Sequence, residues 1–360
     1  MQHDQLMARA IKLAQQGCYT TSPNPNVGCL IVKNGQIIAE GWHQQAGQAH
    51  AEKHALNQLT LAQTTGADCY VTLEPCCHTG KTGPCCEALI KAKVKSVYIA
   101  MIDPNPRVSG KGIMKLRQAG IEVIVGLLTD EAKKLNLDFI HRMQTGRPKV
   151  QSKIAMSLDG RTAMASGESQ WITGQAARQD VQRLRAKACA VMTGIGTVLA
   201  DDPKLTVRSV IDYPDIEVRQ PYRVVVDSGL QTPDNAAVLS SKAKTIIATA
   251  SQKKMADVTV WHCPDESSHR VDLTALLSQL GQYQINQVLV EAGPTLNGAL
   301  IAAGLIDELI LYYSPKILGN NARGAFSIPG LEQLAACCTL SITDMVAVGK
   351  DWRITAIPDY

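Results

Sequence analysis

Apolar side chains near the start of the chain first follow a helical spacing and then form two short runs. In residues 4–16 they recur three or four positions apart, which predicts a helix with one apolar face that ends at Gly17. The runs 28–32 and 36–41 flank an Asn-Gly pair, which is typical of a tight β-hairpin turn. We therefore expect a helix followed by a hairpin whose strands join a covered sheet.

The next hundred residues alternate between apolar runs and segments of helical spacing. Residues 67–75 predict a strand, 85–94 a helix, 96–106 a strand, and 112–126 a helix followed by a strand. Alternation of this kind is typical of a largely parallel sheet covered by helices. The first part of the chain is therefore predicted to be α/β.

Residues 142–148 are polar and contain a glycine and a proline, so we interpret them as a short connection between domains. The resulting domains are residues 1–146 and 147–360. A chain of 360 residues, 45% of them hydrophobic, can form two cores of ordinary size.

The second domain is also predicted to be α/β. We expect helices at 176–188 and 294–304, and the apolar runs between and around them predict strands. Residues 194–197, after one buried strand, predict a polar, glycine-bearing turn. Residues 352–357 predict an edge strand.

Composition and charge narrow the classes of function. Residues 1–146 carry 15 Lys and Arg against 11 Asp and Glu, and the remainder carries 21 against 21, so the net charge is only +4. This charge is too small for a nucleic-acid surface. No apolar run reaches membrane-spanning length, and the N-terminus does not resemble a secretory signal. With eleven cysteines, the chain is expected in the reducing cytoplasm.

The segment from residue 50 to residue 86 carries the most specific chemistry. His50 and Glu52 are followed by Cys76 and Cys85, each directly after a proline. One histidine and two thiolates leave the fourth tetrahedral position of a zinc ion open to water, which is typical of a catalytic site. Glu52 then stands beside the metal as a proton carrier for the release of ammonia.

Other interpretations of these cysteines are weaker. The known base deaminases have two residues between their thiolates, whereas this chain has eight, so either member of each Cys-Cys pair could bind zinc. The Pro-Cys symmetry favours Cys76 and Cys85, with Cys77 and Cys86 as packed neighbours. A closed four-cysteine zinc site would strain the geometry and leave Glu52 without a role, and a disulfide is disfavoured in the cytoplasm.

Two glycine-bearing turns in the second domain suggest a dinucleotide. One lies at 194–197 and the other opens a helix at 293–298. Backbone amides at such turns can hold a pyrophosphate, although ordinary turns between strand and helix would explain the pattern equally well.

Four motifs together resemble the bifunctional riboflavin biosynthesis family, in which a pyrimidine deaminase is fused to a reductase. They are HAE with PCCHTGKTGPC, then AMSLDGRTAMASGESQWIT, then GIGTVLADDPKLTVR, and finally VEAGPTLNGAL. The resemblance covers essentially the whole chain. It implies an N-terminal cytidine-deaminase-like three-layer domain and a C-terminal dihydrofolate-reductase-like domain.

The resemblance also implies two reactions, zinc-dependent deamination of a phosphoribosylated diaminopyrimidine and NADPH-dependent reduction of its ribosyl group to ribityl. Asp201 and Lys153 are the expected reductase catalytic residues, with Asp201 also at the cofactor. The other cofactor-side residues it implies are Ala155, Ser169, Trp171, Thr197, Gly293, Pro294, Thr295, Leu296, Asn297, Gly298 and Ala299. Those facing substrate are Asn24, His43, His78, Lys81 and Asn105 in the first domain and Arg185, Leu205, Arg208 and Glu291 in the second.

Two alternatives remain at this point. A tRNA or nucleoside deaminase would share the zinc residues, but the long thiolate loop, the weak charge and the second domain disfavour it. A zinc-stabilised binding protein would have no use for Glu52. We expect a homo-oligomeric enzyme with a small-molecule substrate and without nucleic-acid or membrane partners.

Overall fold

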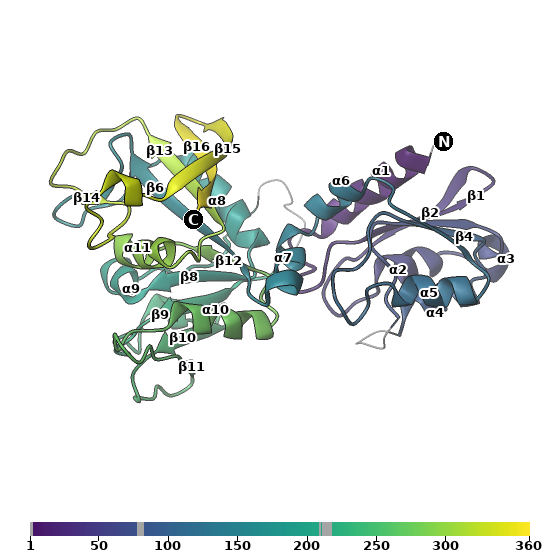
Figure 1. Ribbon diagram of the computed structural model, residues 1–360, viewed down its shortest axis with the longest axis horizontal. Coiled ribbons are helices and arrows are strands. Elements are labelled where there is room, and N and C mark those ends of the chain that lie inside the picture. Colours follow the sequence, from purple (N-terminus) through teal and green to yellow (C-terminus); the bar gives the residue numbers. More distant parts are fainter. Residues whose placement is uncertain (1–2, 78–82, 209, 211–217) are drawn as a thin grey trace. The chain divides into compact units, whose positions relative to one another are not determined.

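The computed structural model describes residues 3–77, 83–208, 210 and 218–360. The chain forms two compact units, Met1–Gly146 and Arg147–Tyr360. Each unit has its own sheet and its own core (Figure 1).

A five-stranded sheet forms the centre of the first unit, in the order β2, β1, β3, β4, β5. Its strands are β1 Gly28–Lys33, β2 Gln36–Trp42, β3 Asp68–Val71, β4 Ser96–Ile99 and β5 Glu122–Val125. β1 is antiparallel to β2 and β3, whereas β3, β4 and β5 are parallel. Asn34 and Gly35 have φ of 53° and 76° at the β1–β2 turn, so the predicted hairpin is confirmed.

Helices cover both faces of this sheet and make three layers (Figure 1). One face packs against α1 His3–Ala14, α6 Thr129–Lys134 and α7 Leu137–Thr145. The other packs against α2 Ala51–Leu56, α4 Cys85–Lys91 and α5 Lys111–Gln118, and a short helix α3 Leu61–Thr64 precedes β3. Neighbouring residues of β1 enter different cores, Leu30 that of α1 and Ile31 that of α2, because successive strand residues face opposite ways.

Two local predictions for this unit were wrong. The first α-helix ends at Ala14 rather than directly before Gly17, and a 3₁₀ turn, Gln15–Gly17, continues it. A Cβ at Gly17 would lie 2.7 Å from the carbonyl oxygen of His43, so close approach explains the glycine. Residues 142–145 are not connecting chain but the last turn of α7, which ends at Gly146 with φ 77°.

A nine-stranded sheet forms the centre of the second unit, in the order β11, β10, β9, β8, β12, β6, β13, β16, β15. The strands are β6 Lys149–Ser157, β8 Ala190–Gly194, β9 Tyr222–Val226, β10 Thr245–Thr249, β11 Thr259–His262, β12 Gln287–Val290, β13 Glu308–Ser314, β15 Thr339–Val348 and β16 Asp351–Asp359. The pairs from β11 to β13 are parallel, and those of β16 are antiparallel. β7 Arg161–Ala163 and β14 Arg323–Gly324 form a separate small ribbon.

Helices cover both faces of this sheet as well. α10 Leu273–Gln282 and α11 Pro294–Ala302 contribute to the larger core on one face. α8 Gln175–Lys187 and α9 Ile195–Asp201 pack on the other. The short 3₁₀ helices Ala237–Leu239 and Leu334–Ala336 lie in connections.

Two predictions for the second unit were wrong. Residues 195–201 form α9 rather than a polar turn, so the glycines begin a helix directly after β8. Strand β16, which contains 352–357, is not at the edge, because β15 pairs with it and takes the edge position. Because β15 is largely exposed, its sequence does not show the continuous apolar run that is typical of the buried strands.

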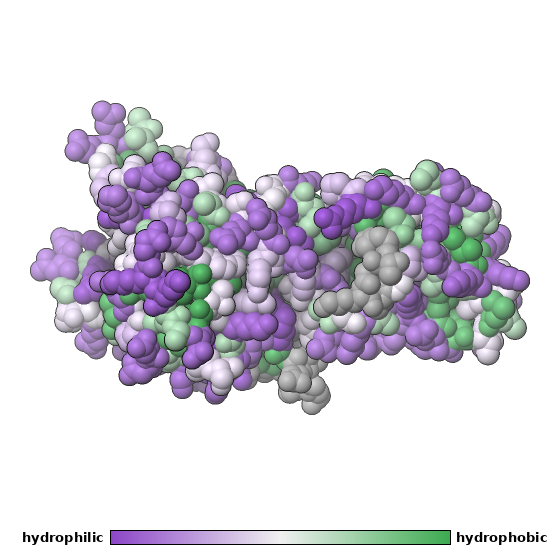
Figure 2. Space-filling view, turned by 90° about the horizontal axis from the view of Figure 1, so that it is seen from below, coloured by the Kyte–Doolittle hydropathy of each residue, from purple (hydrophilic) through white to green (hydrophobic). Residues whose placement is uncertain are grey.

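No helix in the described part of the chain is long and apolar enough to cross a membrane. The face seen in Figure 2 is mainly hydrophilic, with apolar residues in small patches. All eleven cysteines lie in the described part of the chain, and no disulfide bond joins them.

Candidate active sites

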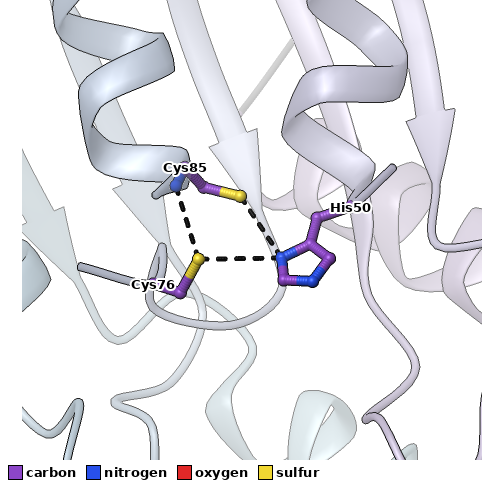
Figure 3. Close-up of side chains that lie close together, drawn as sticks. All are labelled: His50, Cys76 and Cys85. Carbon is purple, nitrogen blue, oxygen red and sulfur yellow. Dashed lines mark hydrogen bonds between the residues drawn. The ribbon is translucent and has the colours of Figure 1, made fainter. Parts of the chain in front are cut away.

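Three side chains of the first unit converge as the sequence predicts for a metal site. The ligand atoms of His50, Cys76 and Cys85 all lie within 4.8 Å of one another. The His50 Nδ1 is 3.7 Å from the Cys76 sulfur and 3.4 Å from the Cys85 sulfur, and the three side chains point toward one another (Figure 3).

The local fold explains this convergence. His50 is the N-cap residue of α2, with extended backbone at φ −71° and ψ 164°, and Cys85 is the first residue of α4. Cys76 lies in the chain that leaves β3, and its sulfur accepts a hydrogen bond of 3.3 Å from the Cys85 backbone N–H. The first residues of α2 and α4 and the chain that follows β3 therefore bring together ligands that are up to 35 positions apart.

The donor set fits zinc. Bonds of about 2.0 Å to nitrogen and 2.3 Å to sulfur at a tetrahedral angle separate the two ligand atoms by roughly 3.5 Å. The two measured nitrogen–sulfur distances, 3.4 and 3.7 Å, bracket this value. Hydrogen bonds from Cys85 and His50 lower the pKa of Cys76 to about 4, which favours the thiolate that a metal requires.

The second cysteine of each pair lies outside the cluster. Cys86 is fully buried in the core beneath α4, and Cys77 packs against the same core. Neither belongs to a metal-binding group among the described residues.

Glu52 is on the first turn of α2 and is only 3% exposed. Burial and the neighbouring Cys76 sulfur raise the pKa of its carboxyl group, while a hydrogen bond with Cys85 opposes them. The structure thus places a buried carboxyl group beside the ligand cluster, where a proton carrier would have to be.

His43, a predicted substrate contact, is buried beside the ligand cluster. It is 2% exposed, and its ring lies edge-on to that of His50 with centroids 5.2 Å apart. Its two ring nitrogens lie 3.0 Å from the Asn24 amide nitrogen and 3.1 Å from the Ala49 carbonyl oxygen. Burial lowers the pKa of His43, which is consistent with a neutral ring that positions Asn24.

Of the other predicted substrate contacts here, Asn105 lies on the loop after β4, where its side-chain oxygen accepts a hydrogen bond from the Arg107 backbone N–H. His78 and Lys81 lie outside the described residues.

Glu74, two residues before Cys76, is a buried residue of the site that no predicted motif includes. This carboxylate is 3% exposed and accepts hydrogen bonds from the backbone N–H groups of Asp103, Gly110, Gly112 and Ile113, at 2.9–3.3 Å. It thereby ties the cysteine segment to the loop that carries Asn105. Its place directly before Pro75-Cys76 is the feature that could have identified it.

The second unit contains a cavity of about 1130 Å³. It lies where β8, β9 and β12 end and reaches the middle of β6. Single small-molecule pockets usually have roughly 300–1,000 Å³, so this one has room for two ligands. Its charged lining residues are mainly cations: Lys153, Arg178, Arg185, Lys204, Arg208, Arg270 and Arg323, against Asp201, Asp202 and Glu291.

A charged cluster occupies the β6 side of this cavity. Arg185 of α8 donates two hydrogen bonds to Glu291, at 2.5 and 3.0 Å, and one to the Thr206 carbonyl. Burial alone would raise the pKa of Glu291, but the charges of Arg185 and Lys153 hold this pKa below its usual value. Burial and the nearby Arg185 lower the pKa of Lys153. Leu205 and Arg208 line the same cavity, so the structure brings together all the predicted substrate residues of this unit.

Most predicted cofactor residues also line the cavity. They are Ala155, Ser169, Trp171, Thr197, Asp201, Gly293, Pro294, Thr295, Leu296 and Ala299. Asn297 and Gly298 do not line it. Asn297 is buried and bonds to Ser152 and Ala292, and a Cβ at Gly298 would lie 1.9 Å from the Ser327 carbonyl oxygen. These two residues therefore pack α11 against its surroundings.

Trp171 is 59% exposed at the rim of the cavity. Arg178 stacks on its ring at 4.6 Å and donates a hydrogen bond to the Thr173 carbonyl, and Lys316 donates one to the Trp171 carbonyl. These contacts hold the exposed ring at the rim, where it can cover a ligand.

Comparison with known proteins agrees with both sites. Residues 1–101 match the cytidine and deoxycytidylate deaminase zinc-binding region, and residues 148–354 match the RibD C-terminal domain. The predicted fold class is thereby confirmed, as are the zinc and NADPH cofactors.

Full-length relatives extend this agreement. The riboflavin biosynthesis protein RibD of Escherichia coli (strain K12) is 51% identical over 98% of both chains, and that of Haemophilus influenzae is 46% identical over 98% of this chain and 96% of its own.

Solved structures of the same kind cover the whole fold. Acinetobacter baumannii RibD (form 2) aligns with a TM-score of 0.92 at 47% identity, over 99% of this chain and 98% of its own. A Thermotoga maritima diaminohydroxyphosphoribosylaminopyrimidine deaminase/5-amino-6-(5-phosphoribosylamino)uracil reductase aligns at 0.85 and 35% identity, over the same shares. The chain therefore belongs to the RibD family, the bifunctional deaminases and reductases of riboflavin biosynthesis.

Proposed function

We propose that residues 1–146 hydrolyse an amino group from 2,5-diamino-6-(5-phosphoribosylamino)pyrimidin-4(3H)-one and that residues 147–360 then reduce the ribosyl side chain of 5-amino-6-(5-phosphoribosylamino)uracil to ribityl. The observation that carries this proposal is the pairing, in one chain, of a His-Cys-Cys cluster beside a buried carboxyl with a large cation-lined cavity. The similarity to RibD proteins over 98% of the chain supports it.

In the deamination, the bond between a ring carbon and its exocyclic amino nitrogen is replaced by a C–O bond, and ammonia leaves. His50, Cys76 and Cys85 would hold the zinc ion, which when bound acts as a Lewis acid that brings the pKa of water towards neutrality. Glu52 takes up the proton released from water and returns it to the departing amine. Asn24, held by His43, and Asn105, held through Glu74, orient the pyrimidine.

In the reduction, the ring-opened sugar presents a C=N bond to the cofactor. When bound, NADPH would supply the hydride for the carbon of this bond, and the nitrogen would take up a proton from water. Arg208 and Arg185, the latter held in place by Glu291, bind the phosphate end of the substrate, since guanidinium groups match phosphate in charge and geometry. Asp201 and Lys153 orient the sugar and the cofactor at the reacting carbon.

Mass analysis of the products tests both steps. The diaminopyrimidine substrate alone should exchange one amino group for oxygen, and addition of NADPH should then add two hydrogens. An unchanged substrate under both conditions would overturn the proposal. Deamination without reduction would overturn the role of residues 147–360.

We further infer that the enzyme is cytoplasmic and homo-oligomeric and binds neither nucleic acid nor membrane. Its eleven cysteines, none of them in a disulfide bond, support a reducing cytoplasm, and its small net charge supports the absence of a nucleic-acid partner. The exposed edge strand β15, with Ile342 63% and Met345 55% exposed, is the surface through which we infer association. Light scattering on wild type and Ile342→Lys tests this, and a wild type that is monomeric at all concentrations would refute it.

A further inference from the structure

Helix α8 carries three polar side chains that line the cavity of the second unit, those of Arg178, Gln182 and Arg185. Arg185 donates its hydrogen bonds to Glu291, and the Gln182 side-chain oxygen accepts one of 2.9 Å from the Arg208 backbone N–H. The position of α8 therefore determines where both guanidinium groups of the proposed phosphate site lie.

Another face of α8 packs against the part of the sheet that contains β13 and β15 (Figure 1). Ala177 and Val181 of the helix share a small core with Tyr312 of β13 and Val348 of β15. Apolar contacts are not directional, so a core of this kind does not by itself prevent the helix from sliding along the sheet. Polar contacts between α8 and the strands provide the missing direction.

Asp180 provides the first of these polar contacts. Its side chain is buried, and one carboxylate oxygen accepts a hydrogen bond of 2.6 Å from the Tyr312 hydroxyl and one of 2.9 Å from Arg353. Tyr312 belongs to β13 and Arg353 to β16, so one carboxylate attaches the middle of α8 to two strands. Hydrogen bonds to a charged group are about twice as strong as neutral ones, which favours a fixed position.

Asp351 provides the second contact, at the start of α8. It is 2% exposed, and its carboxylate accepts a hydrogen bond of 2.7 Å from the backbone N–H of Gly174, the N-cap residue of the helix. The positive end of the helix dipole stabilises a negative charge at this place. A Cβ at Gly349 would lie 2.9 Å from the Ala176 Cβ, so the turn between β15 and β16 also lies directly against the first turn of α8.

We propose that Asp180 and Asp351 are positioning residues of the reductase, which act through α8 to place Arg185 and Arg208 at the phosphate end of the substrate. Both aspartates lie in the described part of the chain, and neither lines the cavity. A displacement of about 1 Å is enough to impair a contact that requires a defined geometry. The inference rests on the proposed reductase function and adds two residues on which its substrate affinity depends.

Steady-state kinetics of Asp180→Ala and Asp351→Ala with the deaminated intermediate test this proposal. The KM for the intermediate should rise about ten-fold or more, while kcat should change less than about three-fold, because phosphate contacts stabilise the bound substrate and its transition state alike. The KM for NADPH should rise less than that for the intermediate, since α11, which begins at the proposed cofactor site, packs on the other face of the sheet.

Two conservative variants test the contacts themselves. Asp351→Asn keeps an oxygen that can accept the Gly174 N–H, so its KM should stay within about three-fold of wild type. Tyr312→Phe removes only the hydroxyl that donates to Asp180 and should raise the KM several-fold. If Asp351→Ala does not fold, Tyr312→Phe decides, and an unchanged KM in this folded variant would overturn the proposal.

Asp307→Ala is the matched control. The Asp307 carboxylate accepts a hydrogen bond of 2.7 Å from the Val150 backbone N–H, directly before β13 and at the end of the parallel strands opposite the cavity. This variant should lower the melting temperature and leave the KM for the intermediate unchanged. An equal rise in KM for Asp307→Ala and Asp180→Ala at the same loss of melting temperature would show that stability is the cause and would refute the positioning role.

The same assays separate this inference from the proposed function. A wild type that does not reduce the deaminated intermediate would refute the reductase function itself. A wild type that reduces it, while Asp180→Ala and Asp351→Ala keep the wild-type KM, would refute only the role of the two aspartates.

Discussion

In the first unit, three ligand atoms lie within 4.8 Å of one another and come from a segment of 36 residues, His50 to Cys85. In the second unit, the cavity of about 1130 Å³ is lined by residues from Lys153 to Arg323. The first site has to accommodate only a metal ion and a flat ring beside a proton carrier. The second needs room for a dinucleotide and a sugar phosphate together.

Because the two sites bind different ligands, their charges also differ. The metal site relies on sulfur, imidazole and carboxyl groups that are buried or half-buried and that attract and hold a cation. The cavity has seven cationic residues against three acidic ones in its lining, which suits ligands with several phosphates. We therefore expect that each site can be disabled without loss of activity at the other.

Removal of zinc should separate them most strongly. A chelator should abolish ammonia release, because water is no longer activated, while NADPH oxidation with the deaminated intermediate continues. Ammonia and NADPH assays on the same sample measure both. Parallel loss of the two activities in a folded protein would contradict two independent sites.

Serine substitutions sharpen the choice of ligands. Cys76→Ser and Cys85→Ser should each lose most of the bound zinc, because both sulfurs approach His50 Nδ1. Cys77→Ser is the matched control and should retain zinc. Metal analysis by mass spectrometry measures the zinc content of each variant. Loss of zinc from Cys77→Ser, with zinc retained in Cys76→Ser and Cys85→Ser, would contradict the assigned ligands.

Glu52→Gln should keep zinc and lose deamination by a factor on the order of a hundred or more, since an amide of the same shape cannot carry the proton. Ammonia release by a zinc-loaded variant is the measurement. A rate close to that of wild type would remove Glu52 from the mechanism.

Asp201→Ala tests the second site alone. NADPH oxidation should fall about ten-fold or more, because a carboxylate that lines the cavity beside Thr197 no longer orients the reacting groups. Ammonia release should stay close to wild type, since Asp201 has no part in activating water. Loss of both activities would mean one shared site.

Glu74→Gln should have the smallest effect. It replaces a carboxylate that accepts four backbone N–H groups with an amide that presents two donors to them, at a cost of about 1–3 kcal/mol in stability. The variant should keep zinc and raise KM for the pyrimidine several-fold through displacement of Asn105. Glu87→Gln, at an exposed surface ion pair, is the control. An unchanged KM would show that Glu74 serves stability only.

The residues of the zinc site were predictable because each of them belongs to a short motif with its own local geometry. His50 and Glu52 lie at one helix start, and Cys85 begins another after its proline. The hairpin at Asn34-Gly35 was predictable for a similar reason, since the turn itself demands residues that accept positive φ. In both cases a few neighbouring residues determine the local geometry.

Tertiary structure alone decided which residues share a site when their contacts span long stretches of chain. Glu74 meets backbone groups about thirty to forty positions away, and Arg185 meets Glu291 106 positions away, which no local pattern shows. The same holds for β16, whose interior position depends on pairing with β15, and for Arg270, which lines the cavity only because its loop bonds to Ser228. Periodicity specifies which face of an element is buried, but only packing of the whole sheet specifies what that face meets.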